Sequence, residues 1–153
     1  MSAARAHGLT LVELMIVLVV LAILATLAVP SFVELLRRQR VQAAAQSLVG
    51  DLQFARTEAQ RRRATVTVET GADPAGYRLL AGTEPLKTVA LPSGVAIDRV
   101  SVAFDALRGH TTATRIELGG DGMPRLRVEL ASTGRTNVCS PDGSFGGEDV
   151  CSK

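Results

Sequence analysis

An apolar run near the N-terminus, from Leu9 to Val29, constrains this chain more than any other feature. Its only ionisable side chain is Glu13. At about 1.5 Å of rise per residue, a helix of this length spans the roughly 30 Å hydrocarbon core of a bilayer. The residues before it carry Arg5 and no acid, which is the charge pattern of a segment left in the cytoplasm. We therefore expect a transmembrane helix at 9–29, with the rest of the chain outside the cytoplasm.

Two details distinguish this run from a secretory signal peptide. The small residue Gly8 precedes the apolar run, so cleavage after Gly8 would remove residues 1–8 and keep the helix. A lone carboxylate such as Glu13 costs several kcal/mol to bury in lipid and needs a partner there. The free amino group of a neighbouring copy's first residue would supply one. The alternative is a plain signal anchor in which Glu13 lies at the membrane interface.

The segment Gly8-Leu-Thr-Leu-Val-Glu13 resembles the prepilin peptidase site of type IV pilins and pseudopilins. The resemblance implies that prepilin peptidase cleaves between Gly8 and Leu9, and that Leu9, where the family usually has Phe, is N-methylated. It further implies an inner-membrane protein whose C-terminal domain lies in the periplasm until the helix packs with other pilins or pseudopilins in a filament. Pro30, at the end of the apolar run, matches a proline of pilin helices and would kink or weaken the helix there.

Residues 30–63 continue the helix in amphipathic form. Apolar side chains recur at steps of three and four, which is one face of an α-helix: Val41, Ala45, Leu48, Leu52, Ala55 and Ala59. This segment is basic. Arg61, Arg62 and Arg63 suit the negative end of the helix dipole, whereas the group Arg37–Arg40 fits either lipid headgroups or acids of neighbouring subunits.

From Ala64 the pattern changes to the period of two that is typical of strands. We expect strands at 64–69, 77–81, 86–91, 95–97, 100–104, 114–118, 125–131 and 135–139. Glycine-rich turns at 119–122 and 132–134 read as hairpin connections, and 104–110 reads as a loop. The fold class is therefore α+β, a long N-terminal helix packed on antiparallel β-sheets, with a β-rich domain at 64–153.

Cys139 and Cys151 are the only cysteines, and both lie near the C-terminus. In a domain exposed to the periplasm, a nearby pair predicts a disulfide that closes the Gly-, Ser- and Asp-rich tail into a loop. A metal pair is the rival interpretation. It is disfavoured because His110 is the only histidine left after cleavage, and two thiolates alone rarely hold structural zinc. We expect no metal and no cofactor.

An enzyme is not indicated. His110 has no acid and serine in an order that suggests a catalytic triad, and the glycine-rich stretch 119–122 precedes no helix that could bind a phosphate. Only 3% of the residues are aromatic, which disfavours stacking platforms for nucleic acid or sugars. We expect no catalytic activity and no small-molecule substrate.

Later segments narrow the resemblance. The stretches 55–59 and 104–110, and the turn at 132–135 ahead of Cys139, are similar to the GspH/FimT branch of minor pilins and pseudopilins. That branch implies a long helix packed on a pair of sheets. It also implies a FimT/FimU-type minor pilin that primes or joins a type IV pilus, with the H pseudopilin of type II secretion as the alternative.

Some members of that branch bind DNA through a Gly-Arg-x-Arg loop, and here the loop reads Gly134-Arg135-Thr-Asn137. Asn137 removes one phosphate contact. Strand alternation places Arg125 and Arg127 on one side, so with Arg135 they are candidate DNA contacts that would support DNA uptake. The alternative is an ordinary turn with one solvated arginine. Acids outnumber bases from residue 64 onward, so any such binding would be weak and salt-sensitive.

Overall fold

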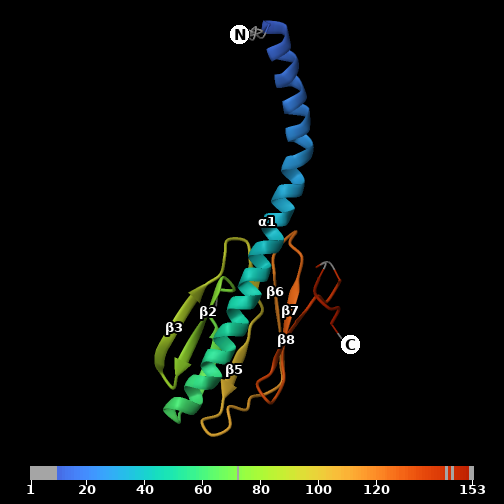
Figure 1. Cartoon of the computed structure of the whole chain (residues 1–153). Helices are drawn as coiled ribbons and strands as arrows, with labels where there is room; N and C mark the ends of the chain where they lie inside the picture. The colour runs from blue at the N-terminus through green and yellow to red at the C-terminus, as the bar shows by residue number, and fades with distance from the viewer. Residues whose placement is uncertain (1–9, 72, 144, 146, 152–153) are drawn as a thin grey trace, which may run out of the picture. The chain divides into compact units, whose positions relative to one another are not determined.

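A computed structural model describes residues 10–71, 73–143, 145 and 147–151 (Figure 1). One long helix, α1 (Leu11–Arg62), precedes the strands, as the sequence predicted. The chain divides into two compact units, one ending at Leu36 and one beginning at Arg37. The boundary lies within α1.

The described part of the N-terminal unit is a capped apolar helix with mostly exposed side chains. The amide of Glu13 donates to the Thr10 hydroxyl oxygen at 3.2 Å, and the amide of Leu14 donates to the Thr10 carbonyl at 3.2 Å. Thr10 is therefore the N-cap of α1, with an acid three residues later as in a capping box. An 18-residue window of α1 has a mean hydropathy of 2.9 and none of it is buried. By length and composition this helix can cross a membrane.

Backbone hydrogen bonds cap the C-terminal end of α1. Arg63 adopts a left-handed conformation with φ of 51°. Its amide donates to the Gln60 carbonyl at 3.4 Å, and the amide of Ala64 donates to the Ala59 carbonyl at 3.2 Å. This pair of bonds is a Schellman motif, which usually has glycine where Arg63 stands.

Two antiparallel four-stranded sheets follow the helix. In the first sheet the order is β3-β2-β1-β5, and in the second it is β4-β6-β7-β8. Each strand lies within two residues of its predicted position. The strands are β1 (Val66–Thr70), β2 (Gly76–Ala81), β3 (Glu84–Ala90), β4 (Ala96–Ile97), β5 (Ser101–Phe104), β6 (Thr114–Gly119), β7 (Leu126–Leu130) and β8 (Thr136–Cys139).

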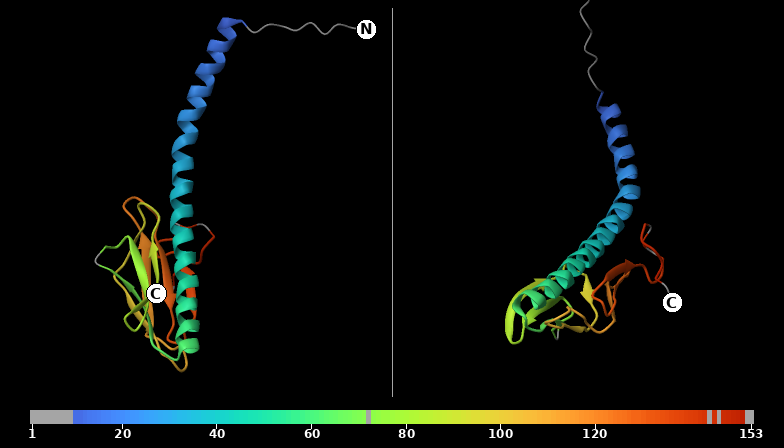
Figure 2. Two further views of the ribbon diagram at one scale, coloured as in Figure 1. Left: turned by 90° about the vertical axis from the view of Figure 1, so that its left-hand side faces the viewer. Right: turned by 60° about the horizontal axis from the view of Figure 1, so that its bottom comes forward.

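The part of α1 beyond Arg37 lies along the sheets and shares one core with them (Figure 2). All six residues of the predicted apolar face, from Val41 to Ala59, are at most 1% exposed. They pack in a cluster with side chains of both sheets, such as Leu79 and Val128. The predicted α+β architecture is confirmed, and the helix face is what joins the two sheets.

Candidate functional site

The proposed processing site, Gly8 and Leu9, lies outside the described residues. Glu13 lies in the first turn of α1, with an exposed side chain among exposed apolar neighbours. No described residue forms an ion pair with it. α1 continues through Pro30, whose missing N–H cannot complete the helical bond to the carbonyl of Thr26. The capping role of the Thr10 hydroxyl was not anticipated from the sequence, although the Thr-x-x-Glu spacing signals it.

The C-terminal segment is a disulfide-closed loop. Cys139, the last residue of β8, is bonded to Cys151. Ser140 fixes the loop, because its amide donates to the Asp149 carbonyl at 2.9 Å and its carbonyl accepts from the Cys151 amide at 3.1 Å. Phe145 is buried in the core and anchors the middle of the loop. The predicted disulfide is present.

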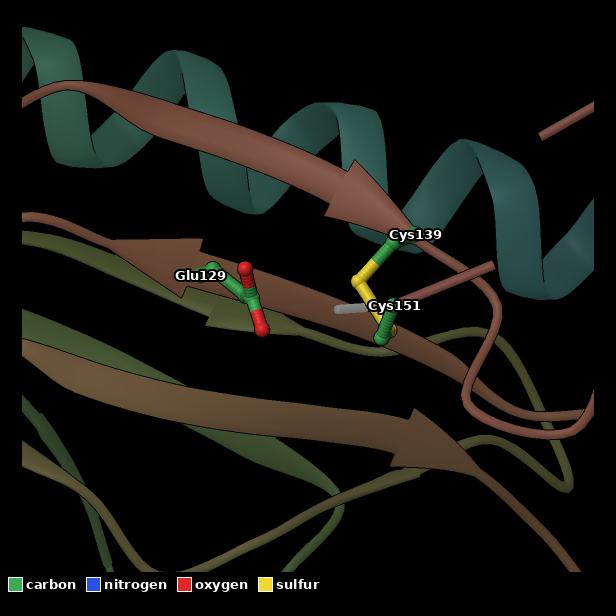
Figure 3. A group of neighbouring side chains, drawn as sticks. All are labelled: Glu129, Cys139 and Cys151. Carbon is green, nitrogen blue, oxygen red and sulfur yellow. A yellow bond between two sulfur atoms is a disulfide. The ribbon is translucent and has the colours of Figure 1, made fainter. Parts of the chain in front are cut away.

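Glu129 lies beside this disulfide (Figure 3). Its carboxylate and the two cysteine sulfurs are within 4.8 Å of one another, a grouping that could suggest a metal site. Sulfur atoms bonded to each other are not the thiolates that zinc requires. The disulfide therefore closes the C-terminal loop, and its sulfur atoms are not thiolate ligands for a metal.

The candidate DNA contacts separate into two places. Arg127 donates to Glu117 Oε1 at 2.7 Å, and Arg125 lies 4.0 Å from Glu117 Oε2. Both arginines, at the start of β7, thus share the carboxylate of Glu117 on β6. Arg135 lies opposite Ala131, at the other end of that strand, where its carbonyl accepts from the Ala131 amide at 2.9 Å. At about 3.4 Å per residue, roughly 20 Å of strand separates Arg125 from that end.

Arg135 instead lies near an arginine that the sequence analysis did not single out. Arg56, on α1, packs against Gly109 and Gly134, each of which has a positive φ. Arg56 and Arg135 line an open groove of about 410 Å³. Neither guanidinium has a hydrogen bond or ion pair among the described residues. The two buried glycines were the available sequence signal, but their closeness depends on the fold.

A second hollow lies on the outer face of β6, β7 and β8. Its lining includes Arg115 and Arg135, with Glu129 opposite Arg115 in the register. Arg115 Nε lies 3.7 Å from Glu129 Oε1. Arg135 therefore borders both the groove beside α1 and the outer face of the sheet.

Two family models match the chain. The model described as type II transport protein GspH matches residues 44–143, and the model described as prokaryotic N-terminal methylation motif matches residues 3–29. The first covers about two thirds of the chain and most of the β-rich domain. The second covers the predicted cleavage site and the apolar helix. None of the curated proteins compared with the chain matches it.

Solved structures share the fold. The type IV minor pilin FimU of Pseudomonas aeruginosa matches with a TM-score of 0.58 at 20% identity, over 72% of this chain and 96% of FimU. The minor pseudopilin EpsH of the Vibrio cholerae type 2 secretion system matches with a TM-score of 0.53 at 17% identity, over 67% of this chain and 98% of EpsH. At these identities the similarity shows a common pilin-like fold.

Proposed function

This chain belongs to the GspH family, whose members are minor pilins and pseudopilins, and from that membership we propose that it is a minor subunit of a type IV pilus. The observation that carries the proposal is the methylation motif at residues 3–29, ahead of a GspH match that begins at residue 44 on the same helix. The apolar helix and this motif fit a pilin anchored in the inner membrane.

We infer that prepilin peptidase removes residues 1–8 and that Leu9 becomes the methylated first residue. The domain map follows: a membrane helix at 9–29, an amphipathic continuation at 30–63 and a periplasmic domain at 64–153. Lipid surrounds the apolar segment until other pilins replace it in the filament. The chain's role is packing and not catalysis.

Glu13 is the residue on which assembly depends in this proposal. Its carboxylate is the only charge between Thr10 and Val33, and no described residue neutralises it. In an apolar filament core the free N-terminal amine of an adjacent subunit would compensate that charge. Because lipid tails offer no such partner, the helix would favour a neighbouring subunit over lipid. Pro30 supports assembly by leaving one helical carbonyl without its usual donor, which weakens the helix locally.

Exchange of Glu13 tests the proposal. Glu13→Ala should leave the protein processed and in the membrane but remove it from sheared filaments, because the compensating contact is lost. Glu84→Ala is the control, since Glu84 is 71% exposed on an edge strand and its variant should enter filaments normally. Normal incorporation of Glu13→Ala would contradict the mechanism.

The H pseudopilin of a type II secretion system is the second candidate, because both kinds of protein share the fold. The Gly134-Arg135 turn before Cys139 favours the FimT/FimU side. A deletion strain separates the two: loss of piliation, twitching or DNA uptake supports the pilus role, whereas loss of protein export supports the secretion role.

DNA binding stays a prediction. Of the three candidate arginines, Arg125 and Arg127 share Glu117, and Arg135 has no ion pair with any described residue. The described geometry thus offers fewer phosphate contacts than the sequence suggested.

A further inference from the structure

Arg56 is held in a channel made by two loops that are distant in sequence. A Cβ atom added at Gly109 would lie 2.8 Å from Arg56 Cγ, and one added at Gly134 would lie 2.8 Å from Arg56 Cδ. Both contacts are closer than real Cβ atoms come, so only glycine at both positions leaves room for the arginine stem. The aliphatic part is therefore packed while the guanidinium reaches the groove.

The groove beside Arg56 has the chemistry of an oxyanion site. Arg135 contributes a second guanidinium from the β7–β8 turn, and its other described lining residues offer hydroxyl, amide or backbone groups: Gln53, Thr57, Gly134 and Thr136. None of these lining residues is acidic. Two guanidiniums without a partner among the described residues, beside hydroxyl groups, are the hydrogen-bond donors that bind carboxylates and phosphates.

The opposite end of the sheets carries exposed carboxylates. The β6–β7 turn lies at one end of β7 and the β7–β8 turn at the other (Figure 1). Exposed carboxylates gather at the β6–β7 end, where Asp98 and Asp121 line one hollow and the amide of Asp98 donates to the Glu117 carbonyl at 3.1 Å. Asp149, in the loop after β8, is exposed at the same end. Arg125 lines the same hollow, and Arg125 and Arg127 share Glu117 there, so this end offers single exposed carboxylates and not a uniformly acidic surface.

We propose that the Arg56–Arg135 groove receives an aspartate or glutamate carboxylate from an adjacent pilin-type subunit in the filament. The proposal rests on the filament role given above and adds a side-chain contact to it. A neighbouring domain built on the same plan, whether a second copy or another pilin, presents exposed carboxylates of the kind described here. An exposed carboxylate that faces the two guanidiniums is favoured over an uncharged or basic side chain at that place.

A carboxylate fits this groove better than a polyanion does. Two unpaired guanidiniums suffice for one carboxylate, whereas duplex DNA needs several phosphate contacts for appreciable affinity. Glu129, beside Arg115 in the adjoining hollow, would also repel a second phosphate.

Site-specific photo-cross-linking of the full chain in assembled filaments tests this contact. The cross-linker replaces Thr57, an exposed residue that lines the groove, and a matched probe replaces the exposed Thr88 on β3. Arg56→Gln and Arg135→Gln should each lower the Thr57 cross-link roughly fivefold, the effect of losing one exposed charge pair. Arg99→Gln, at an exposed arginine outside the groove, should leave it unchanged.

The identity of the cross-linked peptide decides between outcomes. We expect a pilin-type peptide that contains an aspartate or glutamate, from a second copy or another subunit, and expect its charge reversal to rescue Arg135→Glu. A peptide without an acid, a nuclease-sensitive adduct or a cross-link insensitive to both arginines would overturn the carboxylate site while leaving the filament role intact. Absence of the wild-type chain from filaments would overturn both. Arg135 is exposed on a turn, so its variant keeps the test valid if Arg56→Gln does not fold.

Discussion

The phenol of Tyr77 on β2 donates a hydrogen bond to Asp51 Oδ2 on α1 at 2.8 Å, inside the core. Lys87 on β3 completes the group, with Nζ 2.6 Å from Asp51 Oδ1. A buried carboxylate without such donors costs several kcal/mol, so both partners are needed. This contact fixes the helix on the first sheet, next to the apolar face.

Burial first, and then the hydrogen bond to Asp51 and the charge of Asp51, raise the pKa of Tyr77 well above its usual value of 10.0. Stability from the neutral phenol is thus complete below about pH 10 and falls as the pH rises further, by at most about 1.4 kcal/mol per pH unit. Tyr77 is the only tyrosine and there is no tryptophan, so phenolate absorbance reports it alone. We expect ionisation of the fragment 37–153 to coincide with unfolding, whereas ionisation near pH 10 in the folded state would contradict the burial argument.

Hydrogen bonds from Arg61 and then Arg62 lower the pKa of Glu58 to about 2. A lowered pKa means that the stabilisation is complete above the ordinary value of 4.5 and is lost as the pH falls towards 2. Glu58→Gln should therefore flatten the loss of stability between those pH values in urea unfolding. Asp121→Asn, at an exposed acid with no ion pair among the described residues, should retain the wild-type slope. Equal slopes in all three proteins would refute the assignment.

The Cys139–Cys151 bond closes a loop with a sequence separation of 12. Removing it should cost about 3 kcal/mol of unfolding free energy through the greater freedom of the unfolded chain. The measurement compares urea midpoints of the oxidised fragment, the reduced fragment and the double variant Cys139→Ser/Cys151→Ser. We expect the last two to agree, because Phe145 stays available to the core in both. An unchanged midpoint on reduction would show that the loop is held by other contacts.

Gly134→Ala should destabilise the domain more than Gly82→Ala. Both glycines have positive φ, which costs alanine about 1 kcal/mol, but only at Gly134 does the new Cβ meet Arg56. Overpacking there adds about 1–3 kcal/mol. Combining Gly134→Ala with Arg56→Ala should recover at least about 0.5 kcal/mol relative to the sum of the single effects. Additive effects would mean that Arg56 does not occupy the channel.

Local pattern was enough to predict most of the elements. The change of period near residue 64 marks the end of the helix, and the turns at 119–122 and 132–134 do connect antiparallel strands. The observed strand ends differ from the predicted ones by at most two residues, because the hydrogen bonds to the neighbouring strand determine where a strand begins and ends. Arg125 and Arg135 fall just outside β7 and β8, although alternation alone extended the strands through them.

Long-range contacts could not be predicted from one sequence. β1 pairs with β5 across an intervening hairpin, and Arg56 meets Gly109 and Gly134 only because α1 crosses both loops. The candidate DNA contacts show the same limit. Alternation correctly placed Arg125 and Arg127 on one side, but it could not reveal that Glu117, across the strand pair, binds both.

Mass spectrometry of the N-terminal peptide, taken from this chain in sheared filaments, tests the central claim most directly. The account predicts a mature chain that begins at N-methylated Leu9, with residues 1–8 absent. A chain in the membrane that still begins at Met1, in cells with active prepilin peptidase, would contradict it.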